Sequence, residues 1–267
     1  MAIITMGYRS DLLKRNIMFK AYLPVDRPTE EGLAYKKEGT EKFRTLYLLH
    51  GLTNNQDDWI NSSRIERIAR NHNLAVIFPN GENSFYVNGL GPNSDFGRLI
   101  GQELVDFTRK VFPLSDKRED TFIGGVSMGG FGAIRNGLKY ADTFSRIISF
   151  SAAIHLLEFE PGDPRRQLVC DEDQVMGPYR EAVKSDKNPA VCLQQLREKV
   201  EQGKASYPQM YMICGLQDNL IDANRSFHEK LVKAKVPVTY REYPGKHEFE
   251  FWNQHVETMI TWLTEEN

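Results

Sequence analysis

Short apolar runs that end in residues typical of turns are the feature that most constrains the fold of this chain. Six of them occur, at residues 43–49, 74–78, 121–125, 147–151, 210–214 and 236–243. Stretches with the apolar periodicity of helices lie between them, at 64–70, 96–112, 129–140, 219–235 and 251–263. Strands that alternate with helices predict an α/β fold, with a mainly parallel sheet covered by helices on both faces.

Three segments depart from this alternation. Residues 16–23 alternate between apolar and polar and predict an early strand, whereas the polar stretch 26–42 predicts a surface loop. Residues 152–206 separate two apolar runs by far more than an ordinary crossover and contain several prolines. We interpret them as a lid over the functional site, with a helix at 193–200, inserted into a single domain that spans residues 1–267.

Composition argues against several classes of protein. The 34 basic and 36 acidic residues leave a formal net charge of −2, which provides no electrostatic footprint for nucleic acid or for an anionic membrane. No apolar stretch approaches ~18 residues and the N-terminus has no signal-peptide pattern, so we expect a cytoplasmic protein without a membrane partner. The three cysteines have no short spacing, which indicates neither a disulfide framework nor a metal site. The oligomeric state stays open, a homo-oligomer included.

One short motif carries the chemistry. Gly125–Gly129 reads G-V-S-M-G and matches the nucleophile-elbow pattern, in which a serine lies on a tight turn between a strand and a helix. The pattern alone would arise by chance in roughly one chain in ten of this length. Here an apolar run precedes it and a helical pattern follows it, which is the context that the motif requires. The sequence therefore predicts Ser127 as a nucleophile.

The partners of such a serine follow it in the order acid, then histidine. His247 comes just after the sixth apolar run, whereas His255 falls within the last helical pattern. Asp218 comes just after the fifth apolar run, and Asp222 lies four residues further on, where a helix should already have begun. We therefore predict His247 as the general base and Asp218 as the acid that orients it.

The oxyanion formed by nucleophilic attack needs two backbone donors. One is expected from the amide of Met128, the residue after the nucleophile. The other is expected from Leu52, in the loop that follows the first apolar run, where His50 takes a structural role in the turn.

Several side chains near these loops are candidates for the substrate pocket. Trp59, Tyr86 and His155 are our candidates, although each also has an ordinary interpretation as a packing residue. Phe85 shares the loop of Tyr86 and could also face the site, whereas Trp252 is expected to pack in the core.

Taken together, four segments resemble a known family: Leu48–Gly51, Gly125–Ala133, Cys214–Asp218 and Pro244–Glu248. The chain resembles the esterase family that includes esterase D, and it is most similar to bacterial tributyrin esterases and feruloyl (cinnamoyl) esterases. The resemblance covers nearly all of the chain. It implies an α/β-hydrolase fold with a small insertion over the site, no cofactor, and hydrolysis of short acyl or aryl esters. It is weakest in 152–206, which shapes the choice of substrate.

The expected function is that of a serine carboxylesterase, which cleaves small-molecule short-chain acyl or aryl esters, hydroxycinnamoyl esters among them, through an acyl-enzyme. An acyltransferase or an S-formylglutathione-type thioesterase would use the same three residues, and a serine peptidase is a further alternative. A non-catalytic binding protein on this fold is disfavoured, because it predicts the loss of a triad member and all three are present.

Overall fold

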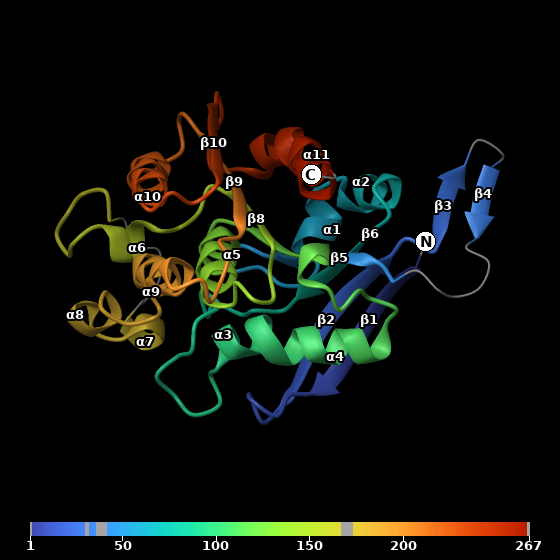
Figure 1. Ribbon diagram of the computed structural model, residues 1–267, viewed down its shortest axis with the longest axis horizontal. Coiled ribbons are helices and arrows are strands. Elements are labelled where there is room, and N and C mark those ends of the chain that lie inside the picture. Colours follow the sequence, from blue (N-terminus) through green and yellow to red (C-terminus); the bar gives the residue numbers. More distant parts are fainter. Residues whose placement is uncertain (1, 30–31, 36–41, 167–172, 266–267) are drawn as a thin grey trace.

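The computed structural model describes residues 2–29, 32–35, 42–166 and 173–265. An eight-stranded sheet forms its centre, in the order β1-β2-β6-β5-β7-β8-β9-β10 (Figure 1). Its strands are β1 (Ala2–Arg9), β2 (Asn16–Leu23), β5 (Arg44–Leu49), β6 (Leu74–Pro79), β7 (Thr121–Val126), β8 (Arg146–Phe150), β9 (Gln209–Gly215) and β10 (Val238–Tyr243). From β6 to β10 all neighbours pair in parallel, whereas β2 runs antiparallel to both β1 and β6.

Helices cover both faces of this sheet. Leu46 and Leu48 of β5 point into a core with α1 (Asp58–Ser62), α2 (Ile65–Asn71) and α11 (Phe249–Thr264). Tyr47 and Leu49 point the opposite way, into a core shared by α4 (Leu104–Val111), α5 (Met128–Lys139), α9 (Pro189–Glu201) and α10 (Ile221–Lys233). Figure 1 shows α11 and α2 on one side of the sheet and α4 on the other. Because successive side chains of a strand alternate between faces, one apolar run supplies both cores.

The predicted α/β fold with a mainly parallel sheet is confirmed. Each of the six apolar runs forms a strand of the sheet, and each helical pattern forms a helix within a few residues of its expected bounds. The pattern at 96–112 is divided into α3 (Phe96–Arg98), the π-helical turn η1 (Leu99–Glu103) and α4, and a short 3-10 turn, η2 (Arg118–Asp120), precedes β7.

Two features of the N-terminal region differ from the expectations. Residues 2–9 form the edge strand β1, which the sequence reasoning did not identify. The loop predicted at 26–42 is wrong in part, because β3 (Asp26–Thr29) and β4 (Gly32–Tyr35) pair as antiparallel strands, whereas 30–31 and 36–41 lie outside the described residues. Charged residues and a proline in this stretch hide its strand pattern.

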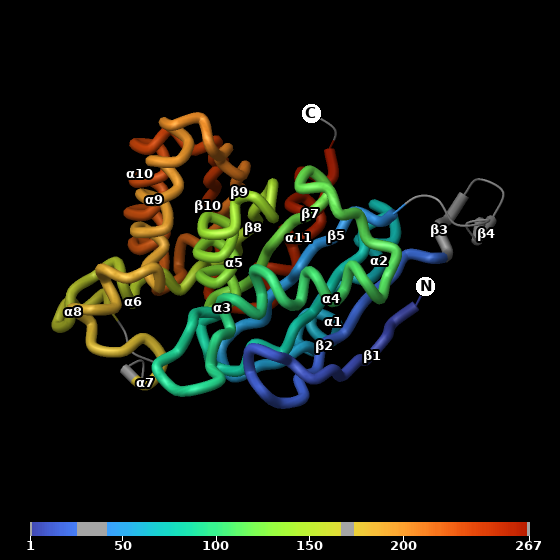
Figure 2. Tube along the Cα trace, turned by 60° about the horizontal axis from the view of Figure 1, so that its bottom comes forward, coloured from blue at the N-terminus to red at the C-terminus, as the bar shows by residue number. Residues whose placement is uncertain are grey.

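The long insertion contributes to the helical layer. It carries α6 (His155–Glu158), α7 (Asp173–Met176), α8 (Tyr179–Ala182) and α9, and residues 167–172 lie outside the described part of the chain. The helix predicted at 193–200 begins four residues earlier, because Pro189 fits the first turn and the Asn188 side chain accepts a hydrogen bond from Ala190 N at 2.9 Å. Figure 2 shows α9 beside α10 and α5, both of which it contacts.

Within the described ranges, no helix has the length and apolar character needed to cross a bilayer.

Candidate active site

Ser127 lies on the sharp turn between β7 and α5. Its backbone angles, φ 55° and ψ −116°, are in a region that L-residues rarely adopt. Ser127 N donates to Phe150 O at 2.9 Å, and Ser127 O accepts from Ala153 N at 3.0 Å. The end of β8 and the start of the insertion therefore hold the serine in this strained position.

Glycines on either side of the serine allow the turn to close. A Cβ on Gly125 would lie 2.4 Å from the Gly129 carbonyl group, and a Cβ on Gly129 would lie 2.4 Å from Leu49 O. Both distances are far below van der Waals contact, so the strand and the helix approach each other only because these positions lack side chains.

The structure brings the three predicted triad residues together. Ser127 Oγ lies 2.9 Å from His247 Nε2, and His247 Nδ1 lies 2.9 Å from Asp218 Oδ2. A carboxylate can only accept, so Nδ1–H donates to Asp218 and Nε2 is left to accept the proton of the Ser127 hydroxyl. His247 follows β10 and Asp218 follows β9, so both occupy loops at the carboxyl ends of parallel strands.

The alternative acid, Asp222, lies elsewhere. Its side chain is 53% exposed and pairs with Arg225 at 3.6 Å, whereas the Asp218 side chain is fully buried beside His247. Burial raises the pKa of Asp218, but the hydrogen bond and charge of His247 and the Leu220 amide outweigh it and bring the pKa below its usual value. Asp218 is therefore ionised at neutral pH.

A cavity of about 470 Å³ opens beside these residues. Its wall includes Gly51, Leu52, Asp58, Phe85, Ser127, Met128, His155, His247, Phe249 and Trp252. Both expected oxyanion donors, Leu52 and Met128, thus flank the serine. Met128 begins α5, where backbone N–H groups have no partner within the helix and the helix dipole favours negative charge.

His50 holds the loop that carries Leu52. Its Nε2 accepts from Gly81 N at 2.9 Å, so its Nδ1 carries the proton and donates to Gly51 O at 2.7 Å. Burial lowers the pKa of His50, so the ring is neutral at pH 7. The structural role expected for this histidine agrees with these contacts.

The three pocket candidates lie in different places. His155, on α6, lines the cavity. Trp59 is buried beneath the loop that carries Leu52 and donates from Nε1 to Leu49 O at 3.0 Å. Tyr86 lies behind the same loop and donates to His50 O at 3.1 Å. The last two therefore support the wall of the cavity from behind and do not line it.

Two residues of the wall have contacts that the sequence did not predict. Trp252 packs in the core, as expected, but its ring also borders the cavity and packs edge-on against His247, with centroids 5.0 Å apart. Asp58 was not considered: it is 6% exposed and accepts from Gly51 N at 3.4 Å, and burial raises its pKa to about 6. The sequence does show two adjacent acids before Trp59, but not which of them faces inward.

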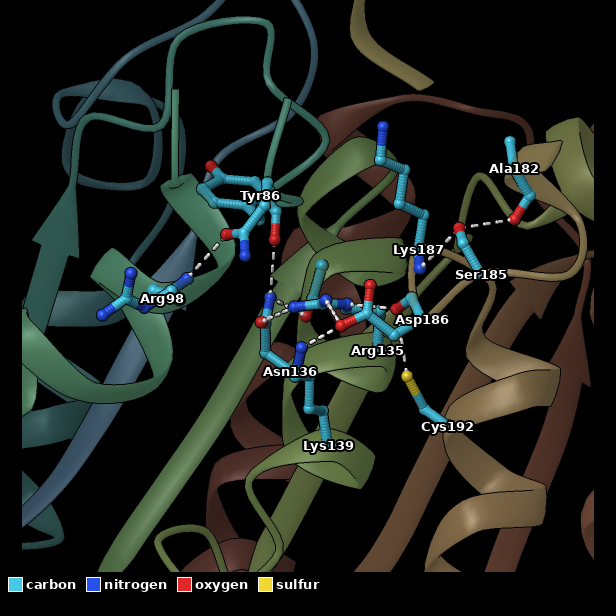
Figure 3. A network of polar contacts seen from close by, with 12 residues as sticks. Tyr86, Arg98, Arg135, Asn136, Lys139, Ala182, Ser185, Asp186, Lys187 and Cys192 are labelled. Atoms are coloured by element: carbon cyan, nitrogen blue, oxygen red, sulfur yellow. Dashed lines mark hydrogen bonds and ion pairs between the residues drawn. The ribbon is translucent and has the colours of Figure 1, made fainter. Parts of the chain in front are cut away.

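A polar network ties α5 to the insertion (Figure 3). The buried side chain of Arg135 donates from Nε to Asp186 O at 2.8 Å and pairs through Nη2 with the Asp186 carboxylate at 3.2 Å. Lys139 pairs with the same carboxylate. Asn136 accepts from Arg135 at 2.7 Å and donates to Tyr86 O at 3.0 Å. The helix that begins at the nucleophile is thereby joined to the insertion and to the loop behind the cavity.

We also searched the described residues for a second pocket and for a metal site. A larger hollow of about 820 Å³ lies between β1 and α4 and is lined largely by charged side chains, none of which belongs to the cavity at Ser127. In the part of the chain that the structure describes, no cluster of three or more His, Cys, Asp or Glu side chains is arranged to hold a metal ion.

Known proteins resemble this chain along its whole length. The family described as Putative esterase matches residues 10–263. An acetyl esterase of Caldicellulosiruptor saccharolyticus is 40% identical over 268 residues, which cover 99% of this chain and 98% of that protein.

Solved structures of esterases and other serine hydrolases also resemble this chain. The substrate-bound fluorophosphonate-binding serine hydrolase F of Staphylococcus aureus superposes with a TM-score of 0.83, and an S-formylglutathione hydrolase (FrmB) of the same organism with 0.80. Each is 29% identical, and in both cases 99% of either chain is covered. A ferulic acid esterase, 19% identical with a TM-score of 0.77 and covering 98% of this chain and 97% of its own, shares the fold. The chain therefore belongs to the Putative esterase family and is a carboxylic ester hydrolase with the α/β-hydrolase fold.

Proposed function

We propose that the protein hydrolyses esters of short-chain acids through an acyl-enzyme formed on Ser127. The observation that carries this proposal is the hydrogen-bonded series Ser127–His247–Asp218, which ends in the cavity beside the expected oxyanion donors. A buried, ionised acid behind the histidine and a serine in front of it form the arrangement that activates a hydroxyl for attack.

The proposed reaction has two halves. In the first, His247 Nε2 takes the hydroxyl proton as Ser127 Oγ bonds to the ester carbonyl carbon, and the carbonyl oxygen becomes an oxyanion held by the amides of Leu52 and Met128. The carbon–oxygen bond to the alcohol then breaks, and His247 gives its proton to the departing alcohol. In the second half, His247 takes a proton from water as the water oxygen bonds to the acyl carbon. The bond between that carbon and Ser127 Oγ then breaks, Oγ takes the proton back from His247, and the free acid leaves.

Three findings bear on the substrate. The acetyl esterase that is 40% identical supports a short acyl group. The cavity is walled by Phe85, Phe249 and Trp252, so an aryl group such as hydroxycinnamoyl is an alternative occupant. The S-formylglutathione hydrolase relative favours a second candidate function, cleavage of a thioester by the same serine. Transfer of the acyl group to an acceptor other than water would use the same intermediate.

We also propose that the chain is one domain and that 152–206 acts as its lid. Ala153 and His155, at the start of this insertion, line the cavity. Further along the insertion, α9 packs on α5, and Asp186 pairs with Arg135 and Lys139 of that helix. Substitutions in the insertion are therefore expected to alter the choice of substrate more than the chemistry.

A panel of p-nitrophenyl esters of increasing acyl length, with methyl ferulate and S-formylglutathione, tests the proposal. We expect the fastest turnover on the acetyl and other short esters and none by Ser127→Ala. Asp218→Asn should lower kcat by about 10³–10⁴-fold, because it favours the wrong tautomer of His247, whereas the matched Asp222→Asn should leave kcat unchanged. Turnover by Ser127→Ala, or an equal loss in the two asparagine variants, would contradict the proposed residues.

A further inference from the structure

Three hydrogen bonds join the loop that follows β6 to the loop that carries Leu52. Two of them end on His50, and in the third Asn83 Oδ1 accepts from Thr53 N at 2.8 Å. Thr53 directly follows Leu52, the residue expected to donate to the oxyanion, and both residues line the cavity. The contact of Asn83 therefore lies one residue away from the expected donor.

Thr53 has a strained backbone. Its φ of 65° is in the left-handed region, which a β-branched residue rarely adopts. A conformation of this kind persists where the surrounding structure holds it in place. The Asn83 side chain supplies such a hold, since it accepts from the amide of the strained residue itself.

The two peptide groups on either side of Leu52 are each fixed by a hydrogen bond. The N–H and the C=O of a trans peptide lie in one plane and point in opposite directions, so a bond to one of them orients the other. In the first group, Gly51 O accepts from His50 Nδ1 at 2.7 Å, which sets the direction of Leu52 N–H. In the second group, the bond from Thr53 N to Asn83 sets the direction of Leu52 C=O. Asn83 and His50 thus fix the two peptide planes that meet at Leu52.

The turn that carries Asn83 has internal support of its own. Ser84 Oγ donates to Gly81 O at 2.5 Å and accepts from Tyr86 N at 3.1 Å, and the Tyr86 side chain is fully buried. These contacts hold the backbone on both sides of Asn83, although Asn83 itself is exposed. The side chain is therefore presented from a fixed turn, from which it can hold the neighbouring loop.

We propose that Asn83 is a positioning residue of the oxyanion hole, whose side-chain oxygen holds the Thr53 amide and thereby keeps Leu52 in the conformation that donates to the oxyanion. This inference rests on the proposed function, in which the Leu52 amide is one of the two donors. Asn83 is not among the described residues that line the cavity, and it acts through the backbone of the loop.

Two substitutions test the role of the side-chain oxygen. Asn83→Ala removes the acceptor and should lower kcat on p-nitrophenyl acetate about fivefold, with KM changed less than about twofold, because the oxyanion forms on the way to the transition state. Asn83→Asp keeps an acceptor at the same place and should retain most of the activity. Both variants should fold, since the side chain is exposed. An unchanged kcat in Asn83→Ala, or an equal loss in Asn83→Asp, would overturn the proposal.

Inhibition by trifluoroacetone separates an effect on the oxyanion from a general structural effect. The ketone adds to an activated serine, and its carbonyl oxygen then becomes an oxyanion that resembles the one in the transition state. Its inhibition constant should therefore rise about fivefold in Asn83→Ala, in step with the loss of kcat. An unchanged inhibition constant would show that the loss of kcat does not arise at the oxyanion and would also overturn the proposal.

Glu82→Gln is the matched control. Glu82 is the neighbour of Asn83 in the same turn, and its exposed carboxylate pairs with Arg15 at 2.6 Å. The kcat and the inhibition constant of this variant should equal those of the wild type. A fivefold change in both would mean that any substitution in this turn affects the oxyanion, and it would contradict a specific role for Asn83.

A second background tests the hold on the strained residue. Glycine adopts the left-handed conformation without support, so Thr53→Gly should make the Asn83 side chain less important. In that background Asn83→Ala should lower kcat less than about twofold, a clear departure from additivity. A full fivefold loss there would contradict the proposed hold on Thr53.

The same assays separate this inference from the proposed function. If Ser127→Ala is inactive and Asn83→Ala is normal, only the role of Asn83 is overturned. If Ser127→Ala retains turnover, the proposed function is wrong and the role of Asn83 is overturned with it.

Discussion

The ion pair between Arg135 of α5 and Asp186 of the insertion yields a prediction for protein stability, and the structure indicates its size. The Arg135 side chain is fully buried, whereas the Asp186 side chain that pairs with it is 35% exposed. Removing one partner of a buried ion pair costs about 3–5 kcal/mol, because the other charge is left without compensation. In Asp186→Ala, Arg135 would keep two acceptors, the backbone carbonyl of residue 186 and the Asn136 side chain (Figure 3). We therefore expect the free energy of unfolding to fall by about 2–3 kcal/mol.

Urea denaturation measures this change directly. Asp186→Asn, which keeps an acceptor for Arg135 but loses the charge, should fall between the wild type and Asp186→Ala. Glu201→Ala serves as the surface control, since Glu201 pairs with Arg197 on α9 while both side chains are more than half exposed, and its unfolding midpoint should not change. An unchanged midpoint for Asp186→Ala would refute the reasoning, because it would show that the buried guanidinium does not need the carboxylate.

Two further predictions concern the loops around the nucleophile. Gly129→Ala would place a Cβ 2.4 Å from Leu49 O, so the free energy of unfolding should fall by about 1–3 kcal/mol, seen as a lower melting temperature, and esterase activity should be lost. The pKa of Asp58 is about 6 in the folded protein, against 3.8 ordinarily, so the folded state binds its proton more tightly and stability should decrease as pH rises from about 4 to 6. We expect this decrease to be about 1–2 kcal/mol, because Asp58 lines an open cavity where solvent screens its charge, and we expect it to be missing from Asp58→Asn. Urea denaturation at a series of pH values measures it, and an identical pH profile in the variant would contradict this.

Local sequence patterns were enough to predict which three side chains the fold brings together around Ser127. The nucleophile elbow is a strand–turn–helix unit, so the residues that shape it lie within a few positions of Ser127 in the sequence. His247 and Asp218 follow strands directly, and the carboxyl ends of parallel strands meet at one edge of the sheet. For the same reason the strands β5 to β10 were predictable from short apolar runs, whereas β1, an edge strand with one exposed face, was not.

The wall of the cavity depends on contacts that no local pattern encodes. Trp59 and Trp252 both lie near the start of a helix, and only the rotation of α1 and α11 against the sheet decides that Trp252 borders the cavity while Trp59 lies beneath it. Asp57 and Asp58 are chemically identical neighbours, and the turn of α1 places Asp58 inside. The partner of Arg135 is Asp186, 51 residues away in the sequence, in a polar part of the insertion that precedes its predicted helix.

Labelling with a fluorophosphonate probe tests the central claim most directly. The probe forms a covalent bond with an activated serine hydroxyl, and peptide mass spectrometry then identifies the labelled residue. We predict a single adduct, on Ser127, that forms in proportion to the loss of ester hydrolysis and is absent from Ser127→Ala. An adduct on another residue that accompanies full inactivation, or a fully labelled Ser127 with undiminished hydrolysis, would contradict the assignment of Ser127 as the nucleophile.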